Sequence, residues 1–85
     1  MKIIFTSKAN SYKTMKEAYK HIGLDEKLID PNCDLGKMKL HYLGLDSESN
    51  EVYVSNYYKN KHIFSNIISG LGSVFKEEII ILDID

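Results

Sequence analysis

A polar stretch between an apolar run and a helical pattern holds the residues best suited to bind an anion. Residues 5–14 read FTSKANSYKT, in which Ser7 and Ser11 supply hydroxyls and Lys8 and Lys13 supply positive charge. Where a strand leads into a helix, free backbone N–H groups and the helix dipole favour an anion. The stretch has no glycine, so its backbone is not suited to wrap a phosphate as a Walker loop does. We therefore expect a capped loop. The alternatives are an anion- or nucleotide-phosphate-binding site and a degenerate enzyme that retains such a site.

The charge distribution favours that same end of the chain for an anionic partner. Residues 1–23 carry five lysines and one glutamate, whereas the remainder carries six lysines and eleven acids. The overall formal charge of −1 hides this asymmetry. A basic first helix in an otherwise acidic chain favours a local anion over a general nucleic-acid surface.

Residues that could hold a metal or act as a nucleophile are present, but they lack the spacing of a site. Cys33, His41, Asp30 and Asp34 are near in sequence, yet the chain has no CxxC or HxxxH pair. Metal sites and thiolate pairs need ligands brought together in such patterns or by the fold. We predict no metal, no cofactor and no catalytic residue, which disfavours an enzyme.

Three aromatic residues raise the alternative of an RNA-binding sandwich. Phe5, Tyr53 and Tyr57 could share one face of a sheet and stack bases there. The Lys/Arg-Gly-aromatic signature of that module is missing, and Glu51 with the acidic hairpin beside it would repel a phosphate backbone. Nucleic acid is therefore a disfavoured partner.

The hydrophobic pattern predicts one domain, residues 1–85, with the element order β-α-β-β-α-β. Asn10 or Ser11 is expected to cap the first helix, and Gly23 to end it. The two middle strands are expected to pair antiparallel across the polar turn DSESN. The expected elements are strands at 2–6, 38–45, 51–58 and 78–85, and helices from about residue 11 to 22 and from 60 to 71.

This order predicts a ferredoxin-like (split βαβ) sandwich, a four-stranded sheet with both helices on one face. Residues 3–5 and 79–82 are apolar at consecutive positions, so these strands present hydrophobic side chains to both faces of the sheet. Either a second copy covers the far face, or the fold is a three-layer α/β arrangement with a mixed sheet. An uncovered apolar face is rare on a soluble monomer.

The function that this pattern favours is a small binding or structural domain that self-associates through an apolar sheet face. The residues expected in the interface are Ile3, Phe5, Tyr53 and Ile81. A homodimer is the simplest closed assembly of this kind, and another protein partner is the alternative.

A resemblance extends over most of the chain. The hairpin and its surroundings, GLDSESNEVYVSN at residues 44–56 and EEIIILD at 77–83, resemble a bacterial family of uncharacterised proteins, domain of unknown function 3189; AYKHIGL at residues 18–24 is similar to its first helix. The resemblance matches His21 and Asp83 to a helix-end histidine and a strand-end aspartate of the family. The family's glycine-rich turn with HSS and its Gly- and Arg-rich tail are absent here, so the chain looks like a short, divergent member. The resemblance implies a fold pattern and no reaction.

Composition predicts a cytoplasmic, bacterial protein. The longest apolar run, residues 79–82, is too short to span a bilayer, and the first two residues lead into a strand rather than a signal peptide. The single cysteine, Cys33, agrees with a reducing compartment. Many Lys, Asn and Ile residues without Trp or Arg are typical of a low-GC bacterial coding sequence.

Overall fold

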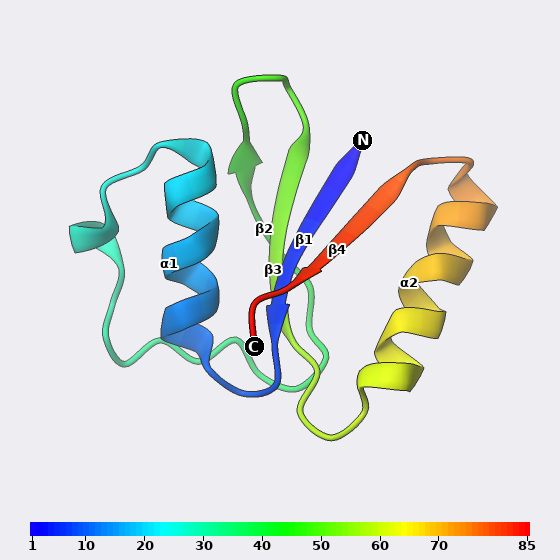
Figure 1. Cartoon of the computed structure of the whole chain (residues 1–85), viewed down its shortest axis with the longest axis horizontal. Coiled ribbons are helices and arrows are strands. Elements are labelled where there is room, and N and C mark those ends of the chain that lie inside the picture. The colour runs from blue at the N-terminus through cyan, green and yellow to red at the C-terminus, as the bar shows by residue number, and fades with distance from the viewer.

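The fold is a four-stranded sheet with one helix on each side (Figure 1). This computed structural model describes the backbone of residues 1–85 and the side chains of all of them except Phe75. The strand order is β2-β3-β1-β4. The elements are β1 (Lys2–Ser7), α1 (Ser11–Ile22), a short 3₁₀ turn (Glu26–Leu28), β2 (His41–Leu45), β3 (Glu51–Asn56), α2 (Lys61–Phe75) and β4 (Ile79–Asp83).

The sheet is mixed. β1 lies at its centre and pairs parallel with both β3 and β4, whereas β2 and β3 form the antiparallel hairpin that the sequence predicted. Alternate side chains of β1 point to opposite faces: Ile3 and Phe5 pack with Ala18 of α1, and Ile4 packs with Phe64 of α2. The predicted α+β chain with a four-stranded sheet and two helices is confirmed at this level.

The prediction that both helices cover one face is wrong, and the ferredoxin-like topology is not confirmed. The difference arises in residues 23–40, between α1 and β2, for which the sequence predicts no element before a strand at residue 38; in the structure β2 begins only at His41. Ile29 and Leu35 are buried in this segment, and the backbone N–H of Leu35 donates to Ser11 Oγ at 3.0 Å. The segment thus returns along α1 to that helix's first turn. β2 therefore starts near the carboxyl end of β1. It runs antiparallel to β1 rather than parallel to it.

α1 begins and ends as its sequence predicts. The Asn10 side chain accepts the backbone N–H of Lys13 at 3.0 Å, which caps the first turn. Gly23 adopts a left-handed conformation with φ 88° and donates its N–H to the carbonyl of Tyr19. The helix is thereby fixed with its N-terminus beside the carboxyl end of β1.

α2 extends beyond its expected end near residue 71. Gly70 and Gly72 lie inside the helix, which continues to Phe75 and closes at Lys76 with φ 52°. A Cβ added to Gly72 would lie 3.1 Å from the carbonyl oxygen of Glu77 and 3.2 Å from Cδ1 of Ile79. This glycine therefore permits the chain to fold back closely from α2 into β4, rather than ending the helix.

Candidate functional site

On the face of the sheet under α2, the half formed by β2 and β3 is only partly covered. A helix is about 10 Å wide and neighbouring strands lie about 4.8 Å apart, so one helix covers about two strands. α2 packs against β4 and against Ile4 of β1. On the β2–β3 side of the same face, Tyr42 is 57% exposed and stacks edge-to-face on Tyr53 with ring centroids 5.4 Å apart. The sheet thus leaves an aromatic surface beside the helix.

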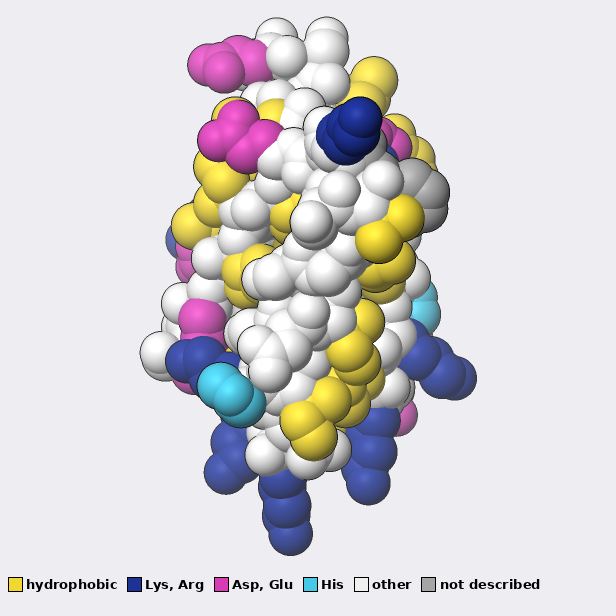
Figure 2. All heavy atoms as spheres, turned by 90° about the vertical axis from the view of Figure 1, so that its right-hand side faces the viewer, with side chains coloured by type: hydrophobic (Ala, Val, Ile, Leu, Met, Phe, Trp, Pro, Cys, Tyr) yellow, Lys and Arg dark blue, Asp and Glu magenta, His cyan; other side chains and the backbone are white. Residues whose placement is uncertain are grey.

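α2 itself exposes apolar side chains next to this vacant half. Ile63, Ile67, Leu71 and Val74 are 54%, 51%, 40% and 74% exposed, and no charged residue occurs from position 63 to 75. Figure 2 shows hydrophobic side chains running along this side of the molecule. Most apolar helices in small proteins bury one stripe and expose charge on the rest. We call this region the α2 surface, and its members are Ile63, Ile67, Leu71 and Val74 of the helix with Leu40, Tyr42 and Tyr53 of the sheet side.

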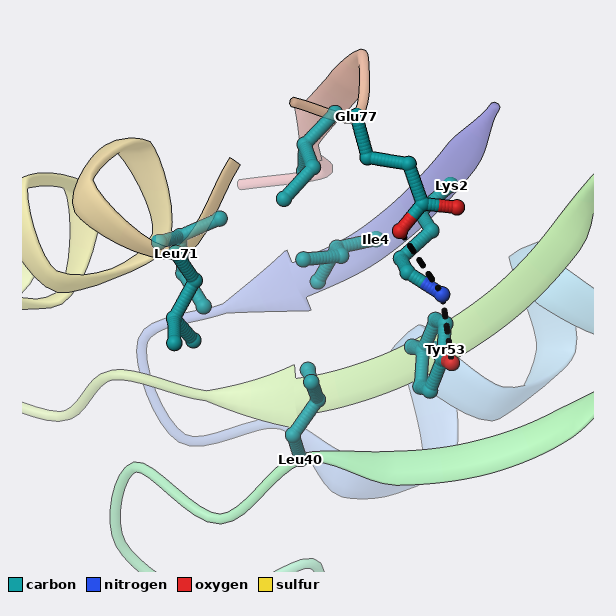
Figure 3. Close-up of a pocket in the computed structure, with 8 residues that line it drawn as sticks. Lys2, Ile4, Leu40, Tyr53, Leu71 and Glu77 are labelled. Atoms are coloured by element: carbon teal, nitrogen blue, oxygen red, sulfur yellow. Dashed lines mark hydrogen bonds and ion pairs between the residues drawn. The ribbon is translucent and has the colours of Figure 1, made fainter. Parts of the chain in front are cut away.

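A small pocket opens within the α2 surface (Figure 3). Its volume is about 110 Å³, well below the roughly 300–1,000 Å³ typical of small-molecule sites. That space suits one aliphatic side chain better than a cofactor. The pocket is lined by Lys2, Ile4, Leu40, Tyr53, Ile68, Leu71, Glu77 and Ile79.

Charged groups surround the mouth of this apolar pocket. Lys2 Nζ lies 2.6 Å from a carboxylate oxygen of Glu51, 3.3 Å from one of Glu77 and 3.4 Å from the hydroxyl of Tyr53. Its hydrogen bond to Glu51, followed by those to Tyr53 and Glu77, raises the pKa of the Lys2 ammonium against the opposing effect of desolvation. The same contact with Lys2 lowers the pKa of the Glu51 carboxyl. The mouth therefore combines fixed charges of both signs with an apolar interior, as at the rim of a protein interface.

The residues expected in a sheet-face interface divide between the two faces. Ile3 and Phe5 are only 7% and 6% exposed because α1 covers them, so they are not available to a partner. Tyr53 and Ile81 lie on the α2 face and are partly buried. The consecutive apolar residues of β1 are accounted for by helices on both faces, which removes the original reason for placing Ile3 and Phe5 in an interface.

The hydroxyls predicted to hold an anion belong to a buried hydrogen-bond network. Thr14 Oγ1 donates to Ser7 Oγ at 2.8 Å, and the side-chain amide of Asn56 donates to Ser11 Oγ at 2.7 Å. Ser7 Oγ lies 3.1 Å from Asn56 Oδ1. Sequence reasoning found both serines but missed Asn56, because the partner lies 49 residues away from Ser7 along the chain. The network joins β1, β3 and α1.

A carboxylate of the chain itself, that of Asp85, lies near the backbone of Lys8 and the ammonium of Lys13. The backbone N–H of Lys8 donates to Asp85 Oδ2 at 2.6 Å, and Lys13 Nζ lies 4.0 Å from Asp85 Oδ1. The loop thus already binds a negatively charged group in the position expected for an anion. Binding of an external phosphate there stays a prediction.

The two residues matched to the family resemblance lie at opposite ends of the sheet. His21 Nε2 is 2.9 Å from Asp46 Oδ2 in the β2–β3 hairpin. Asp83, at the carboxyl end of β4, accepts from Lys61 at 2.6 Å and from the Tyr57 hydroxyl at 3.1 Å. Partial burial opposes ionisation of Asp83, but these contacts, led by Lys61, keep the pKa of its carboxyl lowered. The two residues therefore belong to separate structural contacts and form no common site.

The other candidate constellations do not come together either. Phe5 lies on the α1 face, whereas Tyr53 and Tyr57 lie on the α2 face, so the expected stacking platform for bases is not formed. His41 Nε2 lies 2.6 Å from the carbonyl oxygen of Leu35, to which it can donate. Partial burial, with Asp30 nearby, raises the pKa of the Cys33 thiol. Within the described residues, no group of three or more His, Cys, Asp or Glu side chains could hold a metal ion.

Comparisons with family models, with curated proteins and with solved structures each give no match. The resemblance noted from the hairpin sequence therefore stays a prediction. In the part of the chain that the structure describes, none of the helices has the length and apolar character needed to cross a membrane. The inference about function therefore depends on the geometry alone.

Proposed function

We propose that this chain is a small binding domain that self-associates through the α2 surface. The observation that carries the proposal is the uncharged helical segment at residues 63–75, whose apolar side chains are exposed beside a half-covered sheet. Contiguous exposed apolar surface typically marks an interaction site. Burying it against a second copy removes the surface from water in both chains at once.

The α2 surface is a better candidate for the interface than the exposed apolar residues on the opposite face of the sheet. On the α1 face, β4 exposes Ile80 and Leu82, at 36% and 40%, and these are two residues of one edge strand. The α2 surface combines four exposed helical residues with an aromatic pair and a pocket of side-chain size. A central pocket that receives an apolar side chain is typical of the residues that dominate binding energy in interfaces.

A charge placed in the α2 surface tests the proposal. The variant Ile67→Lys adds an ammonium at a position that is already half exposed, so the fold is retained while burial in an interface becomes costly. Light scattering during size-exclusion chromatography should give a dimer mass for the native chain and a monomer mass for the variant. The control Leu28→Lys changes another exposed leucine, in the 3₁₀ turn beside α1, and should leave the dimer intact. A dimer that survives Ile67→Lys would overturn the proposal.

A further inference from the structure

Building on the proposed self-association, we infer that two copies pair through antiparallel α2 helices that cross near Gly70. The first reason is the spacing of the exposed residues. Ile63, Ile67, Gly70 and Val74 follow one another at steps of four, three and four, which places them on one line along the helix. The same alternation of three and four forms the contact seam of paired helices.

This seam is its own complement when the second helix runs in the opposite direction. Its midpoint falls between residues 68 and 69, so an antiparallel copy places Ile63 against Val74 and Ile67 against Gly70. A large side chain thus meets the smallest residue of the seam at each of the two central contacts. A parallel copy would instead place Ile67 against Ile67 and Gly70 against Gly70, which leaves a gap at the glycines.

Among the atoms that the structure describes, no contact within the single chain explains Gly70. A Cβ added at this position would meet none of them within 4 Å, in contrast to Gly72. Glycine in a helix interior is unfavourable relative to alanine, so an exposed glycine between apolar residues needs another reason. Close approach of a second helix supplies that reason, as the partner's Ile67 would occupy the space above Gly70.

The charges at the two ends of α2 also favour antiparallel pairing. Lys59 and Lys61 lie at the start of the helix, and Glu77 and Glu78 follow its end, with Lys76 between. Lys61 is held by Asp83, whereas Lys59 is exposed and would face Glu78 of the second copy. A parallel pair would place like charges together at both ends, which is unfavourable.

Space for the second helix exists on the sheet. On the β2–β3 half of this face Tyr42 is 57% exposed and Tyr53 is partly buried, and a helix about 10 Å wide can lie over these two strands. Leu71 lines the pocket together with Leu40 and Tyr53, so the pocket side of α2 faces this uncovered half. A second helix beside α2 would therefore also cover the exposed ring of Tyr42 and the partly buried ring of Tyr53.

Substitution of Gly70 tests the close approach. Gly70→Leu adds a good helix former at an exposed position, so helicity should be retained while the space for the partner's Ile67 is filled. We expect the dissociation constant of the dimer to rise by about tenfold or more, because overpacking a close contact is costly. Lys20→Leu, which also places leucine on an exposed helical position but on α1, should leave the dissociation constant unchanged. An unchanged constant for Gly70→Leu would overturn the inference.

Cysteine cross-linking tests the direction of the helices, in a Cys33→Ser background. Mixing Ile63→Cys with Val74→Cys should give the mixed disulfide. Ile63→Cys alone should not link to itself, since the two copies of position 63 would be about 16 Å apart along the helix axis, at about 1.5 Å per residue. Disulfides need Cα atoms within about 7 Å. A dimer in which Ile63→Cys links to itself would overturn the antiparallel pairing and leave the proposed function standing, whereas a native chain that stays monomeric would overturn both.

Discussion

Asp46 is the residue that closes the β2–β3 hairpin and ties it to α1. Its Oδ1 accepts the backbone N–H groups of Glu48 and Asn50 at 2.9 and 2.8 Å, and its Oδ2 lies 2.9 Å from His21. Burial by itself raises the pKa of this carboxyl, but the hydrogen bonds from Asn50, together with those from His21 and Glu48, lower it to about 2. The Asp46–Asn50 pair thus explains the GLDSESNEVYV stretch as a structural turn.

The lowered pKa of Asp46 gives a prediction for stability at acid pH. The folded-state pKa is below the ordinary value of 3.8, so the ionised carboxylate stabilises the fold above that pH and the contribution is lost as pH falls toward about 2. The melting temperature should therefore fall across this range in the native chain. Asp46→Asn, which cannot titrate, should show a shallower fall when thermal unfolding is followed by circular dichroism. Parallel curves for the two proteins would contradict this account of the turn.

Asn56 is a second residue whose role is structural. It is fully buried, and its amide bridges Ser7 and Ser11. Asn56→Ala leaves buried polar groups without partners, so we expect a loss of about 1–3 kcal/mol in the free energy of unfolding. Urea denaturation measures this loss. Asn32→Ala, at an exposed position, should change the free energy by no more than about 0.5 kcal/mol, and equal effects of the two substitutions would argue against a stabilising network.

At the scale of the elements, alanine at each of the two glycines of α2 should change the free energy of unfolding in opposite directions. Gly72→Ala forces a Cβ to within 3.1 Å of the carbonyl oxygen of Glu77, and we expect it to cost about 1–3 kcal/mol. Gly70→Ala meets no neighbour and should stabilise the isolated chain by about 0.5–1 kcal/mol, because alanine favours the helix. Chemical denaturation at a concentration low enough to keep the chain monomeric compares the two. If both substitutions changed the free energy of unfolding in the same direction, Gly72 would not be needed for the turn into β4.

Sequence reasoning succeeded for elements whose signals are local. The cap at Asn10, the stop at Gly23 and the polar turn before Asn50 each act within a few residues, so their types and spacing were sufficient. The directions of the strands depended on residues 23–40, where Leu35 is buried in one core cluster with Ala18 of α1. No local pattern reports such contacts, and the sheet topology was therefore only partly predicted.

The candidate site was likewise predicted only as far as local spacing reaches. Ile63, Phe64, Ile67, Ile68 and Leu71 recur at helical spacing, which places them on one side of the predicted helix. This spacing does not distinguish Phe64 and Ile68, which reach the sheet, from Ile63 and Ile67, which remain exposed. That difference depends on how much of the sheet one helix covers. The surface proposed for self-association thus emerged only from the packing of the whole chain.

At the scale of the whole molecule, the chain of 85 residues forms one four-stranded sheet and two α-helices, one helix on each face of the sheet. Small domains bury a limited fraction of their surface, and here each face is covered by a single helix (Figure 1). Lysine side chains gather at the end of the molecule where α2 begins (Figure 2). An antiparallel second copy would cover the vacant half of the sheet and place that basic end beside the acidic end of its partner.

Sedimentation equilibrium of the unmodified chain over a range of concentrations tests the central claim most directly. We predict a reversible monomer–dimer equilibrium with the dimer dominant at high micromolar concentration, because each copy then buries the exposed apolar residues of α2. A single species of 9.8 kDa at every concentration would contradict self-association.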